Sequence, residues 1–204
     1  MKELFSSYIP QPIGQKKVYS ILLPLIKIKD EWQILYQVRS ETISQPGEVS
    51  FPGGSVESGE TLLEAAIRET CEELLLQPEQ IAVFGEIDYL VHQHRTIHCF
   101  VGQLLVEDWQ TIQPNTDEVA KLFTVPLKTV LEEAPTYHSL TLKVDNQQNF
   151  PFERIRKGPD YPFSNRDWTI PFYEHEGETI WGMTALFTHR FTEIVKENEN
   201  MLDQ

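Results

Sequence analysis

Two adjacent glycines, Gly53 and Gly54, separate two different hydrophobic patterns and constrain the fold more than any other feature of the chain. Before them, "GEVSF" at 47–51 has the character of a short β-strand. After them, the residues from Thr61 to about Leu76 follow helical spacing. Glycine allows a close approach of the backbone and a tight turn. We therefore expect a strand that passes through a glycine turn into a helix.

The helix expected at 61–76 gathers glutamates. At about 100° per residue, Glu69, Glu72 and Glu73 fall on one side, and the packing side is expected to contain Leu63, Ile67, Thr70, Cys71 and Leu74. Carboxylates at this spacing repel one another, and a divalent cation turns the repulsion into ligation. Oxygen ligands suit Mg²⁺ or Mn²⁺. Acidic clusters are more often solvated faces, but the preceding glycines and a possible Arg68–Glu72 pair favour a metal site.

The rest of the chain mixes strand and helix patterns. Residues 17–28 and 32–39 predict a hairpin, and 81–91 and 96–106 return to strand-like runs. A turn and short helix are expected in "VPLKTVLEEA", further strands between 139 and 180, and a terminal helix over about 182–198. This order predicts an α+β fold in α/β/α layers.

Charge and composition exclude several classes of protein. Among 204 residues, 17 are Lys or Arg and 31 are Asp or Glu, which gives a formal net charge of −14. Surfaces that bind nucleic acid or anionic membranes need the opposite sign. The two cysteines, Cys71 and Cys99, do not suggest a disulfide framework. With no signal-like or membrane-spanning segment recognised, the expectation is a soluble cytoplasmic protein of undetermined oligomeric state.

The glutamate helix and its glycine turn resemble the box of the Nudix hydrolase family. That pattern runs Gly, five residues, Glu, seven residues, Arg-Glu, apolar, any, Glu-Glu, any, Gly, apolar. Over residues 54–76 it is matched at seven positions: Gly54, Glu60, Arg68, Glu69, Glu72, Glu73 and Leu76. Two positions depart, since Thr70 replaces an aliphatic residue and Leu75 replaces the glycine at the helix end.

The resemblance implies a single Nudix hydrolase domain over 1–204, with a mixed β-sheet between helices, that cleaves a nucleoside diphosphate derivative with Mg²⁺ or Mn²⁺. The metal ligands it implies are Glu69, Glu72, Glu73 and the Gly54 carbonyl. One of these carboxylates is expected to act as general base. Glu118, outside the box, is a further catalytic candidate, with a solvent-facing acid as the alternative.

A second resemblance concerns the substrate. Residues 35–54, "LYQVRSETISQPGEVSFPGG", are similar to the signature that precedes the box in coenzyme A pyrophosphatases. Tyr36 and Gln37 stand where that signature has Leu-Thr, the segment before Gly47 is one residue shorter, and its second arginine is missing, with His94 or Arg95 as possible substitutes. "IWGMTA" at 180–185 is also similar to the subfamily. Coenzyme A or an acyl-CoA is therefore the expected substrate, cleaved to 3′,5′-ADP and 4′-phosphopantetheine or its acyl form.

The expected substrate contacts combine this resemblance with side-chain chemistry. Arg39 offers a fork for phosphate, although a surface ion pair is the alternative. Phe51 could form, with Pro52, a wall for a base or a pantetheine arm, although an aromatic residue at a strand end is more often part of the core. The other expected contacts are Gly53, Gly54 and Arg68. His92, His94 and His98 favour surface or substrate contacts over zinc, and the basic segment 153–163 suggests either a shield for an anion or surface charge balance.

Two alternatives to the coenzyme A assignment stay open. The same box serves hydrolases of ADP-ribose, NADH or nucleoside triphosphates, which differ in the pocket beside it. A module that senses nucleotides without hydrolysis is the alternative from another class, and the complete set of box glutamates argues against it.

Overall fold

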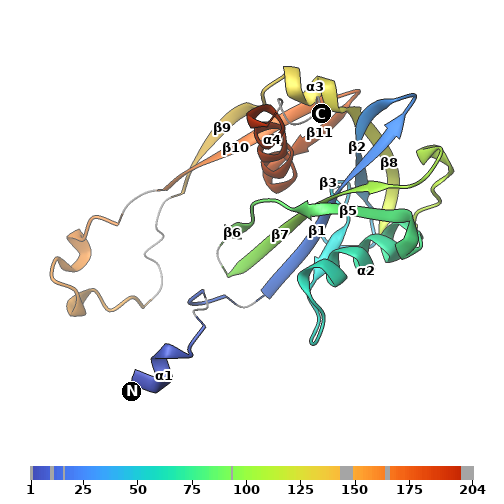
Figure 1. Ribbon diagram of the computed structural model, residues 1–204. Helices are drawn as coiled ribbons and strands as arrows, with labels where there is room; N and C mark the ends of the chain where they lie inside the picture. Colours follow the sequence, from blue (N-terminus) through green and yellow to red (C-terminus); the bar gives the residue numbers. More distant parts are fainter. Residues whose placement is uncertain are drawn as a thin grey trace.

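The computed structural model describes residues 2–9, 12–15, 17–92, 94–142, 149–163 and 166–198. Figure 1 shows a central twisted sheet with helices on both sides and a long arm that projects from one end. The α-helices are α1 (Lys2–Ser6), α2 (Leu62–Leu74), α3 (Leu127–Glu132) and α4 (Gly182–Glu197). Short 3₁₀ turns lie at Pro78–Gln80, Trp109–Thr111, Phe152–Arg154 and Gly158–Asp160.

The central sheet is mixed. Its strands are β1 (Lys17–Ile28), β2 (Glu31–Arg39), β3 (Val49–Ser50), β4 (Gly53–Ser55), β5 (Ile81–Glu86), β6 (Leu90–His92), β7 (Arg95–Leu104) and β8 (Val119–Pro126). The main order is β3-β2-β1-β7-β5, with β4 on β1, β6 on β7 and β8 on β2. Only β1 and β7 pair in parallel among these described strands. The predicted hairpin of β1 and β2 is confirmed, and Lys29 and Asp30 form its turn with positive φ angles.

Each face of the sheet carries its own core. On one face, Leu22, Leu35 and Phe100 pack with Ala66 and Leu74 of α2. On the other face, an aromatic and aliphatic cluster extends to α4 and contains Tyr36, Phe51, Val125, Ala185, Phe187 and Phe191. Because helices cover both faces of a mixed sheet, the expected α+β fold with α/β/α layers is confirmed.

A second sheet extends from the body into the arm. It consists of β9 (Thr136–Leu142), β10 (Arg166–His175) and β11 (Glu178–Trp181), paired antiparallel in the order β11-β10-β9. The described segment 149–163 lies at the outer end of this arm, away from α2 (Figure 1). None of the described helices is long and apolar enough to span a bilayer.

Two details of the sequence interpretation need correction. Glu73 lies on the packed side of α2 with only 5% of its surface exposed, whereas Leu63, expected on that side, is 37% exposed. The strand β8 was not anticipated, although the run "VAKLFTVP" pairs with β2 along its length.

Leu75 takes the left-handed conformation that glycine usually supplies at a helix end, with φ 50° and ψ 41°.

Candidate active site

The start of α2 is set by a capping box. The Thr61 hydroxyl accepts a hydrogen bond from the Glu64 backbone N–H, and the Glu64 carboxylate accepts one from the Thr61 N–H at 2.7 Å. This reciprocal pair satisfies two backbone donors at the first turn. Because the helix start fixes the helical phase, it also determines which way Glu69, Glu72 and Glu73 project from α2.

The two glycines before α2 allow contacts that no other residue would permit. A Cβ atom on Gly53, whose φ is +152°, would lie 2.5 Å from the Ser20 carbonyl oxygen of β1. A Cβ atom on Gly54 would lie 2.2 Å from Glu69 Oε1. The Glu69 carboxylate therefore occupies the space beside the Gly54 backbone, and the predicted juxtaposition of glycine and glutamate is present.

Arg68 ties the acidic residues of this region together. Its guanidinium donates to Glu60 at 2.9 and 3.1 Å, to Glu69 at 2.9 Å and to Glu72 at 3.2 Å. It also donates to the Ser55 backbone carbonyl at 3.1 Å. The hydrogen bond from Arg68 lowers the pKa of Glu60. The side chain thus offsets the repulsion between neighbouring carboxylates, and it is a structural centre of the cluster.

Glu73 sits deeper than the other two helix glutamates. Its Oε2 accepts hydrogen bonds from Gln37 Nε2 at 2.7 Å and from the Gly53 N–H at 3.2 Å. Burial away from water raises the pKa of Glu73 to about 7, against the lowering effect of these two donors. Gln37 was missed as a site residue, although a polar side chain in the largely apolar strand "ILYQV" is a signal that sequence reasoning can use.

The loop before β8 brings Glu118 to the same region. The Asn115 N–H donates to the Glu73 carbonyl and the Ser40 N–H donates to the Glu118 carbonyl, each at 2.9 Å. Desolvation raises the pKa of Glu69, and the charges of Glu72 and Glu118 raise it further. The negative charge of Glu118 also contributes to the raised pKa of Glu73. The four predicted carboxylates therefore interact electrostatically.

The chemistry of this donor set fits a hard divalent cation. Carboxylate oxygens and a glycine carbonyl are the ligands that Mg²⁺ and Mn²⁺ take, and the space at Gly54 already contains a carboxylate. Within the described ranges, however, no three His, Cys, Asp or Glu side chains are placed to hold an ion as they stand. Glu69 and Glu72 are paired with Arg68, and Glu73 with Gln37. Ion binding therefore requires part of this network to rearrange.

The other predicted substrate contacts have different surroundings. Arg39, at the end of β2, donates from Nε to the Ser44 carbonyl at 2.7 Å and so braces the loop before Gly47. It has no carboxylate partner among the described ion pairs, which leaves N–H groups for an anion. Phe51 is 4% exposed and stacks on Tyr36 at 5.1 Å, which is the core alternative and leaves little surface for a ligand.

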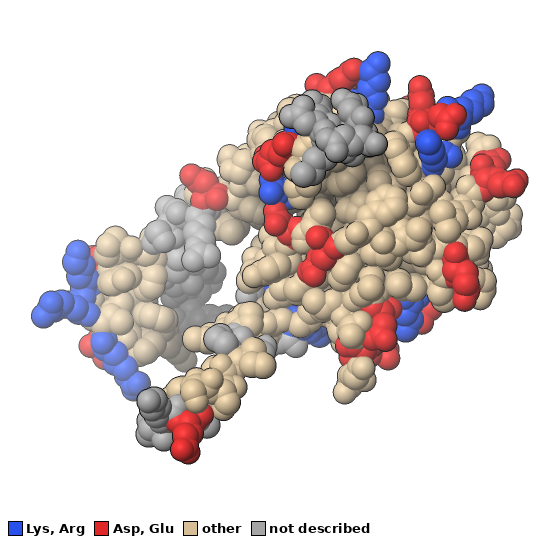
Figure 2. Space-filling model, viewed as in Figure 1, with Lys and Arg blue, Asp and Glu red and all other residues tan. Residues whose placement is uncertain are grey.

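The three histidines of the β6–β7 region have separate partners. His98 Nδ1 lies 2.6 Å from Glu86, His94 Nδ1 lies 3.1 Å from the Gly14 carbonyl, and His92 stacks on Trp168. The basic segment 153–163 is at the arm's outer end, where Figure 2 shows several Lys and Arg side chains. Neither group is part of the carboxylate cluster around α2.

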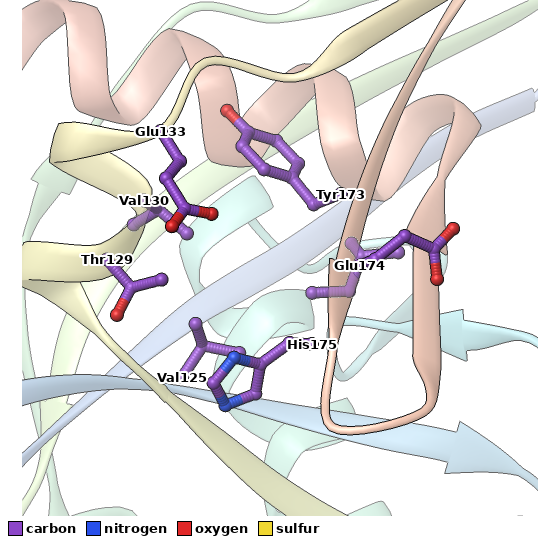
Figure 3. Close-up of a pocket in the computed structure, with 8 residues that line it drawn as sticks. Val125, Thr129, Val130, Glu133, Tyr173, Glu174 and His175 are labelled. Atoms are coloured by element: carbon purple, nitrogen blue, oxygen red, sulfur yellow. The ribbon is translucent and has the colours of Figure 1, made fainter.

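A small pocket lies between α3, β8 and the second sheet (Figure 3). It is lined by Val125, Thr129, Val130, Glu133, Tyr173, Glu174, His175 and Ile180. None of these residues belongs to the glycine turn or to α2, so the pocket is distinct from the carboxylate cluster.

Comparisons with known proteins agree with the geometry. The NUDIX domain model matches residues 19–143. Nudix hydrolase 3 of Caenorhabditis elegans is 26% identical over 189 residues, covering 84% of this chain and 70% of that protein. The human mitochondrial coenzyme A diphosphatase NUDT8 is 27% identical over 173 residues, covering 83% of this chain and 65% of that protein.

A solved structure of similar fold extends over nearly the whole chain. The MutT/nudix family protein from Enterococcus faecalis aligns with a TM-score of 0.53 at 12% identity, covering 96% of this chain and 68% of that one. At this identity the likeness concerns the fold alone. The family is shown by the domain match, which covers more than half of the residues and includes the glycine turn and the glutamate helix. The chain therefore belongs to the Nudix hydrolase family, and the predicted class, a pyrophosphatase acting on phosphorus anhydrides, is supported.

Proposed function

We propose that this chain is a metal-dependent diphosphatase that hydrolyses coenzyme A or an acyl-CoA to 3′,5′-ADP and 4′-phosphopantetheine or its acyl form. The observation that carries the proposal is the placement of Glu69 beside Gly54 and of Glu73 on the Gly53 N–H. The charge of Glu72 acts on Glu69, and the charge of Glu118 acts on both of these carboxylates. A pyrophosphate is densely anionic, and its hydrolysis at neutral pH needs charge neutralisation and a basic water.

In this proposal Glu69, Glu72, Glu73 and the Gly54 carbonyl hold Mg²⁺ or Mn²⁺. When bound, the cation neutralises phosphate charge and lowers the pKa of a water molecule. The protein supplies a general base from one of the helix glutamates or from Glu118. Desolvation raises the pKa of Glu69 and of Glu73, and because the charges of the neighbouring carboxylates raise both further, these groups titrate as a coupled set.

The choice of coenzyme A is supported by the residues upstream of the box. Arg39 is tethered at one edge by Ser44, and its remaining N–H groups suit phosphate oxygens. Gly53 and Gly54 permit close approach of a phosphate to the backbone. The human relative whose name includes coenzyme A diphosphatase aligns over most of this chain. Phe51 is buried, so its part in this proposal is to support the glycine loop from the core and not to touch the substrate.

We also propose that the chain forms one domain, lies in the cytoplasm and has a small molecule as its partner. One domain over 1–204 is supported by hydrogen bonds from α4 to the body, from Thr184 to the Val49 carbonyl at 3.0 Å and between Thr188 and Tyr36 at 2.9 Å. A cytoplasmic location is supported by the two unpaired cysteines, Cys71 and Cys99. The proposed partner is a small nucleoside diphosphate derivative, and the acidic surface gives no support for nucleic acid or anionic membrane.

The test is identification of products by mass spectrometry. The purified protein is incubated with free coenzyme A, an acyl-CoA, NADH or ADP-ribose, each with Mg²⁺, Mn²⁺ or a chelator. Metal-dependent release of 3′,5′-ADP, strongly favoured over the products of the other substrates, is the expected result. Preferred cleavage of NADH or ADP-ribose would instead keep the metal site and reject coenzyme A. Tight binding of a nucleotide without product would favour the sensing module.

A further inference from the structure

Gln37 is a buried polar side chain that contacts Glu73 of the carboxylate cluster. It lies in β2 with 1% of its surface exposed, on the sheet face that carries α2. Alternation along the strand puts Gln33 and Leu35 on the same face, and Leu35 belongs to the apolar core beneath α2. Burying an amide among such neighbours costs free energy unless its polar atoms find partners.

The amide of Gln37 bridges two elements of the site. Its Nε2 donates to Glu73 Oε2 at 2.7 Å and lies 3.3 Å from the Ser50 hydroxyl in β3. The Gly53 N–H donates to the same Glu73 oxygen at 3.2 Å. Both donors therefore converge on Oε2, and in the described part of the chain the other oxygen, Oε1, receives no hydrogen bond.

The second polar atom of Gln37 argues against a purely structural role. Its Oε1 is buried without a hydrogen-bond partner among the described residues. The NH₂ end of the amide faces Glu73, so the carbonyl end points away from this partner and is left unpaired. An unsatisfied buried acceptor is costly. An apolar side chain of similar length would fill the same space without that cost.

We infer that Gln37 is a positioning residue: it holds the Glu73 carboxylate through one oxygen and leaves the other oxygen for the divalent cation. The inference rests on the proposed metal site, but not on coenzyme A as substrate.

The test measures the affinity for Mn²⁺ alone, by titration calorimetry on the full chain without substrate. Gln37→Met removes the donor and keeps the length of the side chain, and Gln37→Thr serves as a second variant if the first does not fold. Gln33→Met is the matched control, because Gln33 is buried on the same face of the same strand and none of the hydrogen bonds described reaches Glu73 from it. Circular dichroism checks that each variant is folded.

Gln37→Met is expected to bind Mn²⁺ roughly 10- to 100-fold more weakly, as changes behind a metal ligand commonly do. Gln33→Met should bind like the parent. In a Glu73→Gln background, Gln37→Met should cause no further loss, because the carboxylate that it positions is gone.

Three results would overturn the positioning role: parental affinity in Gln37→Met, an equal loss in Gln33→Met, or a loss that persists in the Glu73→Gln background. A parent protein that binds no Mn²⁺ would remove both this role and the proposed metal site. Mn²⁺ binding with the expected pattern, together with cleavage of a substrate other than coenzyme A, would uphold the positioning role and reject only the substrate.

Discussion

The substitution Glu73→Gln should make the metal-free protein more stable at neutral and alkaline pH while it removes a carboxylate of the proposed metal site. Glu73 is 5% exposed, and burial raises its pKa to about 7 from an ordinary value of 4.5. A glutamine keeps an oxygen that can accept from Gln37 and from the Gly53 N–H. The buried negative charge is the main feature that the substitution removes.

The sign and size follow from proton linkage. A raised folded-state pKa means that the folded protein binds the proton more tightly than the unfolded chain, so ionisation costs stability as pH rises. The cost is absent below about pH 4.5, grows between 4.5 and 7, and is complete above about 7. The difference between these two values corresponds to roughly 3 kcal/mol, an order-of-magnitude figure for the advantage of glutamine at pH 8.

The assay is urea unfolding of both proteins at several values between pH 4.5 and 8 in the presence of a chelator. Glu72→Gln is the control, because the Glu72 side chain is 54% exposed and its removal should change stability by only a few tenths of a kcal/mol. Saturating Mg²⁺ should reduce the advantage of Glu73→Gln, because an ion that binds the folded parent stabilises it. An advantage that does not grow with pH, or a variant less stable than the parent at pH 8, would refute the reasoning.

Three further substitutions separate the roles of neighbouring residues. Leu75→Gly should raise the free energy of unfolding by up to about 1 kcal/mol in urea titrations, because Leu75 is 60% exposed and left-handed; a loss of stability would contradict this. Gly54→Ala should abolish turnover and weaken Mn²⁺ binding while the protein stays folded, because the new Cβ displaces Glu69; retained turnover would contradict that contact. Phe51→Leu should lower the thermal midpoint and leave KM unchanged, since Phe51 is core; a changed KM with an unchanged midpoint would support a substrate wall.

Much of the fold could be predicted because its signals are local. The β1–β2 hairpin, the switch at Gly53 and Gly54, and the length of α2 follow from alternation, glycine chemistry and helical spacing. Strand β8 was missed because its burial pattern does not alternate regularly along the sequence. Its position in the sheet is set by its pairing with β2. A strand of this kind is defined by its neighbour more than by its own pattern.

That the helix glutamates lie close together was predictable from the sequence, but how deeply each one is buried was not. Helical geometry alone put Glu69, Glu72 and Glu73 on one open face, whereas the sheet beneath α2 covers Glu73 and leaves Glu72 exposed. That difference depends on how α2 lies over β1 and β4, which no local pattern encodes. The contact of Gln37 with Glu73 joins residues 36 positions apart, so it could not be read from spacing.

The most direct test of the central claim is a crystal structure of the protein soaked in Mn²⁺, with anomalous diffraction measured to locate the ion. An anomalous peak between the Glu69, Glu72 and Glu73 carboxylates and the Gly54 carbonyl, with Arg68 withdrawn from at least one glutamate, is the expected result. A saturated crystal with no peak at α2, or with Mn²⁺ held only by other residues, would contradict the metal site and the proposed function built on it.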